Sequence, residues 1–249
     1  MQKNQQVMYP EEREYSWQDG KTLTIGKKTL IMGILNVTPD SFSDGGKWNS
    51  VDRAVQHMLE MVVNGADIID IGAESSRPGF VTTMSAKEEI ERLKPFLEAV
   101  LPACPVPVSI DTFKAETAAY AAEQGVHMLN DIWGLQYAEE PGEMAKVAAE
   151  YDLPVVVMHN RDSKVYKGDI IDSMRAFFQR SIDIACEAGV KQENIILDPG
   201  IGFGKDVEGN LEVMNRLQEL KKFAGHRYPL LLGTSRKSFI GNTLDLPVE

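Results

Sequence analysis

The feature that most constrains the fold is a repeated order of amphipathic helix, glycine, apolar strand and acidic or amide residue. It recurs in NGADIIDIG, EQGVHMLNDI and EAGVKQENIILDPG. In each stretch a glycine stands where a helix needs a left-handed C-terminal residue before the strand begins, at Gly65, Gly125 and Gly189. Helices that alternate with strands along the whole chain indicate an α/β fold with a parallel sheet and crossover helices.

The apolar runs predict seven buried strands. They lie near residues 30–35, 67–72, 106–111, 127–131, 155–159, 195–198 and 230–234. Two architectures fit: a doubly wound open sheet, or an eight-stranded barrel with one strand missing. Polar residues follow nearly every strand, namely Asn36, Glu74, Asp111, Asn130, His159, Asp198 and Ser235. An open sheet concentrates its ligand groups at one switch point, whereas a barrel gathers them from strands all round its rim, so we favour the barrel.

Length and composition indicate one domain over residues 1–249. The 249 residues are 43% hydrophobic, which is enough for a single sizeable core. Before the first buried strand, Asp19-Gly20 separates two half-apolar runs and predicts a β-hairpin within the lead-in of residues 1–28. We interpret this hairpin as a lid on one end of the core.

Charge and cysteine content limit the partners and the compartment. The net charge of -11 disfavours a nucleic-acid partner, which would require a basic patch. Cys104 and Cys186 show no CxxC or Cys/His spacing, so neither a zinc site nor a disulfide framework is indicated. The polar N-terminus is no signal peptide, and no apolar run approaches membrane-spanning length. We therefore expect a cytoplasmic protein with small-molecule partners and no membrane contact.

Three strand ends carry groups suited to binding a ligand. Asp111, Asn130 and Asp198 each end a different apolar strand, in VPVSID, VHMLND and NIILDP. Any one of them alone could be a helix cap. Together with Lys237, which follows the seventh strand, they favour a convergent polar pocket for a flat heterocycle with several donors and acceptors. Lys237 suits either a Schiff base or a fixed cation that donates to a substrate.

Two loops offer further candidates. VTPDSFSDGG, with Asp40, Ser41, Phe42 and Asp44, reads as a mobile lid or as a plain surface loop. Asn36 and Asp40 offer hard oxygen ligands, which suit Mg²⁺ bridging to substrate phosphates. In AESSRPGFVTT, Arg77 precedes a proline that fixes the backbone; a surface arginine is common, yet arginine also suits carboxylate or phosphate recognition.

The stretch PGIGFGK fits neither nucleotide-binding pattern. A GxGxxG from Gly200 needs its third glycine at Lys205, and a Walker loop that ends in Gly204-Lys205 needs its first glycine at Pro199. We expect these glycines to let the backbone approach a ligand or turn tightly, with Phe203 available to pack. No GxSxG elbow exists, which disfavours a serine hydrolase. His159 fits a core group as well as a catalytic one, and Met158 is more typical of core.

Six motifs together closely resemble the dihydropteroate synthase family of folate biosynthesis. In the family's order, from Met32 to Gly241, they are NVTPDSFSDGG, ESSRPG, SIDT, LNDI, DPGIGFGK and SRKS. The resemblance implies a (β/α)8 barrel. It also implies the condensation of 6-hydroxymethyl-7,8-dihydropterin pyrophosphate with 4-aminobenzoate to 7,8-dihydropteroate and pyrophosphate. Sulfonamides would compete with aminobenzoate, and the enzyme would be a homodimer.

The resemblance also implies roles for single residues. The pterin would be held by Asp111, Asn130, Asp198 and Lys237, with Met158 against its ring. The aminobenzoate side would be lined by Ser76, Arg77, Phe203 and Ser235. Asn36 would bind Mg²⁺ together with the pyrophosphate. Because no protein nucleophile is needed, we hypothesise an SN1-like departure of pyrophosphate before the amine attacks.

Two positions depart from the family pattern. Ser76 stands where the family usually has threonine, which keeps the hydroxyl and drops a methyl group. The chain ends at Glu249, before the last helix, strand and helix that family members carry. We therefore expect a barrel that lacks its eighth strand, with unpaired edges on the neighbouring strands.

Three other functions stay open at this point. A methyltetrahydrofolate-binding methyltransferase domain has a similar barrel and pterin pocket, and methyl transfer to a cobalamin protein would identify it. A truncated barrel that binds pterin without turnover is the second. A Schiff-base lyase that uses Lys237 is the third, and borohydride trapping would identify it.

The position of Asp111 at a strand end generates the first prediction. Replacing it by asparagine, Asp111→Asn, should abolish pterin binding while the fold stays intact, because the amide keeps the shape of the carboxylate and loses its charge. Calorimetric titration with a pterin, together with circular dichroism, checks both halves of the statement. Unchanged pterin affinity would remove Asp111 from the site.

Overall fold

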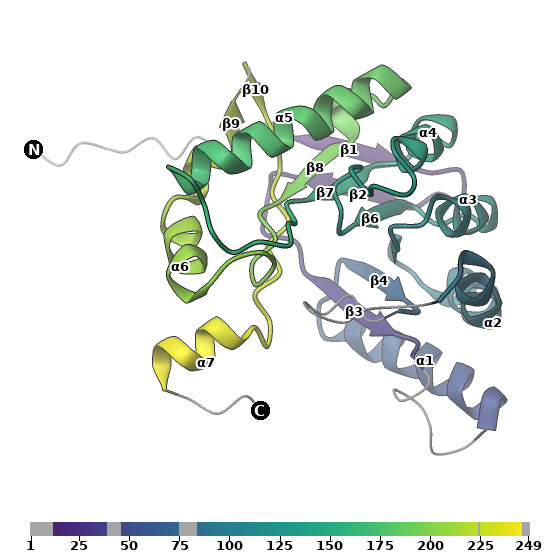
Figure 1. The fold of residues 1–249 in the computed structure, drawn as a ribbon. Helices are drawn as coiled ribbons and strands as arrows, with labels where there is room; N and C mark the ends of the chain where they lie inside the picture. Colours follow the sequence, from purple (N-terminus) through teal and green to yellow (C-terminus); the bar gives the residue numbers. More distant parts are fainter. Residues whose placement is uncertain (1–11, 39–45, 75–83, 224, 246–249) are drawn as a thin grey trace, which may run out of the picture.

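The main element of the fold is a parallel sheet of six strands. The computed structural model describes residues 12–38, 46–74, 84–223 and 225–245. The strands pair in the order β3-β4-β5-β6-β7-β8, which is also their order in the chain. Their bounds are β3 Met32–Asn36, β4 Ile68–Gly72, β5 Val108–Asp111, β6 Met128–Asp131, β7 Val155–Met158 and β8 Ile195–Asp198. The predicted α/β class with a parallel sheet is confirmed (Figure 1).

Helices connect the parallel strands. Their bounds are α1 Gly46–Val63, α2 Ala86–Ala103, α3 Ala115–Gln124, α4 Glu143–Glu150, α5 Ile170–Ala188, α6 Val207–Asn215 and α7 Ser238–Leu244. Short 3-10 turns occupy η1 Gln192–Asn194 and η2 Leu217–Leu220, and a small ribbon pairs β9 Lys222–Phe223 with β10 His226–Arg227. Figure 1 shows α1 to α4 side by side along one side of the sheet. This is the arrangement that repeated right-handed crossovers produce.

Local sequence explains where helices begin and end. Helix α2 starts at a capping box, in which the Ser85 hydroxyl accepts from the Glu88 backbone N–H and the Glu88 carboxylate accepts from the Ser85 N–H. Gly125 and Gly189 end α3 and α5 with φ of 94° and 95°. Gly65 follows α1 with φ of 104°. The three predicted left-handed helix ends are therefore confirmed.

The two faces of each strand have different surroundings. Successive side chains of a strand point to opposite faces. One face packs against the helices and is mostly apolar; its fully buried members include Leu35, Ile69, Ile71, Val108, Ile110, Leu129, Val155, Val157, Ile195 and Leu197. The exception is buried Asp131 at the end of β6. The other face is apolar where the strands begin, at Ile68, Met128, Val156 and Ile196. Toward the strand ends this second face becomes mostly polar, with Met158 as an apolar member.

The N-terminal hairpin closes the apolar end of that second face. Strands β1 Arg13–Ser16 and β2 Thr22–Ile25 pair antiparallel, and Gly20 takes a φ of 85° in the turn between them. Tyr15 and Leu23 pack on the apolar strand beginnings. The Arg13 guanidinium donates to the carbonyls of Glu193, Ile195 and Arg227 at 2.7–3.0 Å. The predicted hairpin and its place over one end of the core are confirmed.

The prediction of a seventh strand at residues 230–234 was wrong in the length of the strand. Only one parallel bridge forms there, between Leu197 and Leu230. The Leu197 N–H donates to Pro229 O at 3.0 Å, and the Leu231 N–H donates to Leu197 O at 2.9 Å. Strand β8 ends one residue later and runs into Pro199, which has no N–H, and residues 232–234 therefore lose their ladder partner.

The remaining features concern the sheet edge and the surface. Within the described residues no backbone ladder joins β3 to the segment at Leu230, so barrel closure is not seen there.

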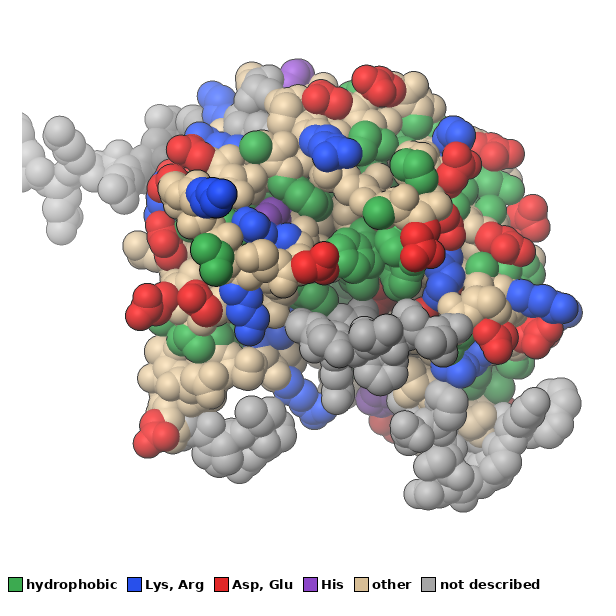
Figure 2. Space-filling model, in the orientation of Figure 1, with side chains coloured by type: hydrophobic (Ala, Val, Ile, Leu, Met, Phe, Trp, Pro, Cys, Tyr) green, Lys and Arg blue, Asp and Glu red, His purple; other side chains and the backbone are tan. Residues whose placement is uncertain are grey.

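Two observations describe the helices and the surface. Among the described residues, no helix is long and apolar enough to cross a membrane. Figure 2 shows charged side chains of both signs on one face of the molecule, around a centre where hydrophobic side chains reach the surface.

The packing of the hairpin generates the second prediction. Leu23 is 5% exposed against the apolar strand beginnings. Truncation in Leu23→Ala leaves a cavity there and should lower the free energy of unfolding by about 2–4 kcal/mol. Denaturant titration checks this, with Thr22→Ala on the exposed side of the same strand as the matched control. A loss below about 1 kcal/mol would mean that the hairpin is not part of the core.

Candidate active site

Parallel pairing brings four strand ends into one row. Asn36 lies opposite Gly72, Gly72 opposite Asp111, and Asp111 opposite Asn130. Asn36 is exposed, whereas Asp111 and Asn130 are half-buried. A side chain on Gly72 would crowd its neighbour, because an added Cβ would lie 3.3 Å from the Asp111 Cβ. Glycine at this position leaves room for the Asp111 carboxylate at the carboxyl end of the sheet.

Asp198 is the most buried acid among the predicted site residues. It is 6% exposed at the end of β8, and its Oδ1 accepts from the Gly200 N–H at 2.7 Å. Burial raises the pKa of Asp198 to about 6; the Gly200 N–H and the charges of Lys205 and Lys237 oppose the rise. Met158 lies opposite Asp198 in the parallel register and is buried, so it can serve as an apolar wall beside it.

Lys237 lies within reach of the site's negative charges. Burial lowers the pKa of Lys237, and the charges of Asp198 and Asp111 oppose that effect. Its ammonium stands 4.3 Å from the centroid of the Phe203 ring, which is within the range of a cation–π contact. Gly202 lies beneath the lysine stem, since a Cβ there would be 3.1 Å from Lys237 Cδ. Lys237 thus lies over a ring, close enough to Asp198 and Asp111 for their charges to act on it.

The glycine-rich loop after β8 turns tightly, as its glycines predict. Gly200 has φ of 62°, and an added Cβ would lie 2.1 Å from the His159 carbonyl oxygen. The Lys205 ammonium, buried under the loop, donates to the Gly200 and Phe203 carbonyls at 2.9 and 3.0 Å. Burial lowers the pKa of Lys205 to about 7, against the charge of Asp198. This lysine stabilises the loop from inside.

His159 faces the helices rather than the polar strand ends. Its ring packs edge-on against Phe177 of α5, with centroids 4.9 Å apart. Its Nδ1 lies 3.1 Å from the Lys205 ammonium, which makes Nδ1 the acceptor. Burial, with the charges of Lys205 and Arg161, lowers the pKa of His159 to about 2. Of the two readings of this histidine, the structure supports the neutral core group.

Several predicted residues lie at the rim or outside the described residues. Ser235 is exposed in the turn that leads to Lys237, where Arg236 has a φ of 55°. The following predicted residues fall outside the described ranges: Asp40, Ser41, Phe42, Asp44, Ser76 and Arg77. Their roles therefore stay predictions.

Two buried polar groups near the strand ends were not predicted from the sequence, although Glu74, a member of the second, was identified there as a residue that follows a strand. Asp70, within β4, is 4% exposed and accepts from the Asn130 Nδ2 at 3.0 Å. The sequence feature that could have identified Asp70 is an acidic residue inside the apolar run IIDIG. The second group is an ion cluster in which buried Lys114 bonds to Glu74, and to Glu89 at 3.0 Å. No spacing rule connects these residues, which come from three different segments.

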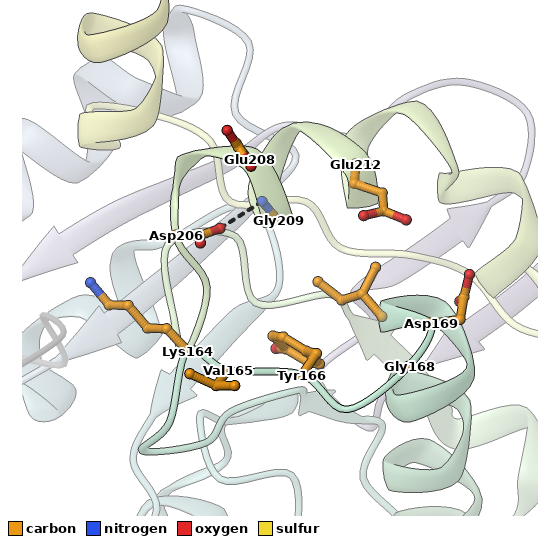
Figure 3. A pocket seen from close by; sticks show the side chains of 10 residues that line it. Lys164, Val165, Tyr166, Gly168, Asp169, Asp206, Glu208, Gly209 and Glu212 are labelled. Atoms are coloured by element: carbon orange, nitrogen blue, oxygen red, sulfur yellow. Dashed lines mark hydrogen bonds between the residues drawn. The ribbon is translucent and has the colours of Figure 1, made fainter.

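A shallow hollow elsewhere has the wrong charge for an anionic ligand. It lies between the segment at Tyr166 and the start of α6 (Figure 3). Its lining carries four carboxylates and a single lysine: Asp169, Asp206, Glu208, Glu212 and Lys164. Asp206 is already engaged, because it caps α6 by accepting from the Gly209 N–H at 2.8 Å. None of the strand-end residues lines this hollow.

Comparison with known proteins agrees with this geometry. The family described as "Pterin binding enzyme" matches residues 32–249. A dihydropteroate synthase of Clostridium beijerinckii is 54% identical over 92% of this chain and 82% of its own length. A Clostridium difficile dihydropteroate synthase, solved in the presence of pteroic acid, has a TM-score of 0.82 and 51% identity, covering 88% of this chain and 81% of its own.

A second solved structure is more distant in sequence and equally similar in shape. It is a Xanthomonas albilineans dihydropteroate synthase with 4-aminobenzoic acid, which has a TM-score of 0.82 and 37% identity over 91% of this chain and 80% of its own. Identity at this level over most of both chains, together with the family model that matches residues 32–249, establishes the relationship. The chain belongs to the dihydropteroate synthase family of pterin-binding enzymes.

Proposed function

We propose that this chain joins 6-hydroxymethyl-7,8-dihydropterin pyrophosphate to 4-aminobenzoate, which gives 7,8-dihydropteroate and pyrophosphate. The observation that carries the proposal is that Asp111, Asn130 and Asp198 end strands of one parallel sheet, with Lys237 over the Phe203 ring of the loop that follows Asp198. A pterin ring offers both donors and acceptors on its edge, which carboxylates, an amide and an ammonium can pair. Asp111, Asn130, Asp198 and Lys237 are the proposed pterin-binding residues.

The chemistry follows from the charges of these residues. As pyrophosphate departs, positive charge grows on the pterin ring, and the carboxylates of Asp111 and Asp198 stabilise it. Buried Met158 lies against the ring face. Aminobenzoate then attacks the exposed methylene carbon with its amine, so the reaction needs no protein nucleophile. The proposed binding side for aminobenzoate comprises Ser76, Arg77, Phe203 and Ser235. Sulfonamides compete with aminobenzoate there.

Departure of pyrophosphate calls for a counter-charge. Magnesium, when bound, neutralises the leaving anion. Asn36 fits such an ion, since its amide is exposed in the same row as Asp111. Within the described residues no cluster of three or more His, Cys, Asp or Glu could hold a metal. The ion would therefore take most of its ligands from water and substrate, as magnesium usually does. Asp40, Ser41, Phe42 and Asp44 belong to the proposed loop over this end.

The wider architecture is proposed on the same basis. The six strands and the bridge at Leu230 follow the order of a (β/α)8 barrel with the hairpin under one end, in a single domain. A reducing cytoplasmic compartment is consistent with two free cysteines, buried Cys104 and exposed Cys186. The homodimer rests on the family resemblance and is part of the proposal.

The raised pKa of Asp198 generates the third prediction. The folded pKa, about 6, exceeds the ordinary value of 3.8, so between these values the folded state binds more protons than the unfolded state. Stability from this group is therefore full below about pH 4 and is lost as pH rises through 6. Asp198→Asn removes this titrating group. The free energy of unfolding of the variant minus that of the wild type should therefore increase as the pH rises from about 4 to above 6.

The same variant should lose activity, because an amide cannot carry the charge that stabilises the ring. Urea titrations of both proteins at several pH values, paired with turnover assays, test the two effects together. A difference in unfolding free energy that is constant from pH 4 to 7 would contradict the assignment. Asp206→Asn, an exposed acid at a helix cap, serves as the matched control.

Turnover itself is the fourth prediction. With Mg²⁺ and the pterin pyrophosphate, this chain should release pyrophosphate and form dihydropteroate when 4-aminobenzoate is present. A coupled phosphate assay and chromatography of the product measure the two. Pterin binding without turnover would favour a binding-only module instead.

Two mixtures test the rival chemistry at Lys237. In the turnover mixture the mass of the protein should stay unchanged, because the lysine acts as a fixed cation; a covalent pterin adduct on Lys237, seen by peptide mass spectrometry, would defeat the dissociative mechanism. In a second mixture the chain is incubated with an aldehyde or ketone and then reduced with borohydride. Selective trapping of that compound on Lys237 would support a Schiff-base lyase.

A further inference from the structure

A buried carboxylate lies one row below the proposed pterin site. Asp70 stands in the middle of β4, opposite Ile34 on one side and Ser109 on the other. It is two residues before Gly72, so it shares the face of the sheet that carries Asp111 and Asn130. Burying a charge at 4% exposure costs free energy unless a partner compensates it. The identity of that partner indicates what Asp70 does.

The partner is Asn130, two strands away. Asp70 Oδ2 accepts from Asn130 Nδ2 at 3.0 Å, although β5 lies between β4 and β6. Ser109, the residue of β5 in this row, is small and fully buried, which leaves space for the bond to cross above it. A larger side chain at this position would separate the two groups. The contact is therefore built by three strands together.

The other carboxylate oxygen adds a second observation. Asp70 Oδ1 is buried and has no hydrogen-bond partner among the described residues. Burial raises the pKa of Asp70, and the side chains of Ser109 and Asn130 oppose this rise. A buried carboxyl group with one unpaired oxygen lowers the stability of the fold, and a strand does not need such a group in order to form. Such groups are retained where they determine the geometry of a site.

We infer that Asp70 is a positioning residue that fixes the side-chain amide of Asn130 for pterin binding. The bond uses the NH₂ group of Asn130 as its donor and a carboxyl oxygen of Asp70 as its acceptor. The Oδ1 of Asn130 is then turned away from Asp70 and is available to accept a ring N–H of the pterin. Without Asp70 the amide can rotate by half a turn and present donors where the ring also has donors. The inference rests on the proposed function through the role of Asn130.

A purely structural role for Asp70 makes a different prediction. If Asp70 only ties β4 to β6, its loss lowers stability and affects pterin affinity independently of Asn130. If it acts through Asn130, its loss has no effect on affinity once Asn130 is gone. Double-mutant cycles distinguish these two cases, because residues that act as one unit are not additive.

The fifth prediction is therefore a cycle of Asp70→Ala, Asn130→Ala and the double variant. Alanine is chosen at position 70 because asparagine would keep an oxygen that accepts the same hydrogen bond. Calorimetry measures the Kd of each protein for 6-hydroxymethyl-7,8-dihydropterin, which lacks the pyrophosphate and does not turn over. Asp70→Ala should weaken binding about tenfold in the wild-type background. In the Asn130→Ala background the same change should alter Kd by less than about twofold. Asp67→Ala, which removes an acid just before β4 that bonds to Lys28 and to the Ile31 N–H, should leave Kd unchanged.

Steady-state kinetics supply a readout that stability alone does not move. Asp70→Ala should raise KM for the pterin substrate and leave KM for 4-aminobenzoate unchanged. An equal loss of pterin affinity for Asp70→Ala in both backgrounds would overturn the inference and leave the proposed function standing. Failure of the wild-type chain to bind the pterin would overturn the proposed function and the inference with it.

A measurement on the unmodified chain covers variants that do not fold. In ¹H–¹⁵N spectra, one side-chain amide proton of Asn130 should exchange slowly with solvent, because Asp70 Oδ2 holds it, and it should remain slow when pterin is added. Exchange as fast as that of an exposed asparagine, before and after pterin, would overturn the inference. Asn64, exposed at the end of α1, provides the reference rate.

Discussion

The site depends on one constraint, the in-register parallel pairing of strands whose side chains alternate between two faces. The register places Asn36, Gly72, Asp111 and Asn130 in a single row. Alternation then assigns one face entirely to the helices and leaves the other to change from apolar to polar along the strands. A shift by one residue in any strand would move its polar group to the helix side. The hydrophobic packing of the helices therefore also fixes the position of the chemistry.

The electrostatics of the strand ends are organised around burial. Asp198 is buried and Lys237 is half-buried. Burial disfavours the charged form of each group, and the charge of each opposes this effect on the other. Phe203 adds a ring face to the lysine. The chain as a whole has a net charge of -11, so an anionic substrate must be attracted by these local cations rather than by the overall field. The acidic hollow near α6 is unsuited to that role.

Buried polar networks also hold the parts of the site together. Lys205 fills the underside of the glycine-rich loop, and His159 behind it is kept neutral. Lys114 connects Glu74, after β4, to Glu89 in α2, and one Glu74 oxygen remains without a partner in the described part of the chain. Asp70 connects β4 to β6 below the row of strand ends. Such networks are costly when incomplete, so each rigidifies its surroundings only because several elements close around it.

The elements and their order were predictable from local features of the sequence. Hydrophobic periodicity, the glycines after helices and the Asp-Gly turn are such features, and they predicted the six strands, the hairpin, and the helix ends at Gly65, Gly125 and Gly189. They also predicted that Asp111, Asn130 and Asp198 lie at one edge, because parallel strands end at one edge. Packing in three dimensions was needed to orient His159, to limit the pairing at Leu230, and to form the bonds of Asp70 and Lys114. These depend on contacts between residues far apart in the chain, which no local pattern encodes.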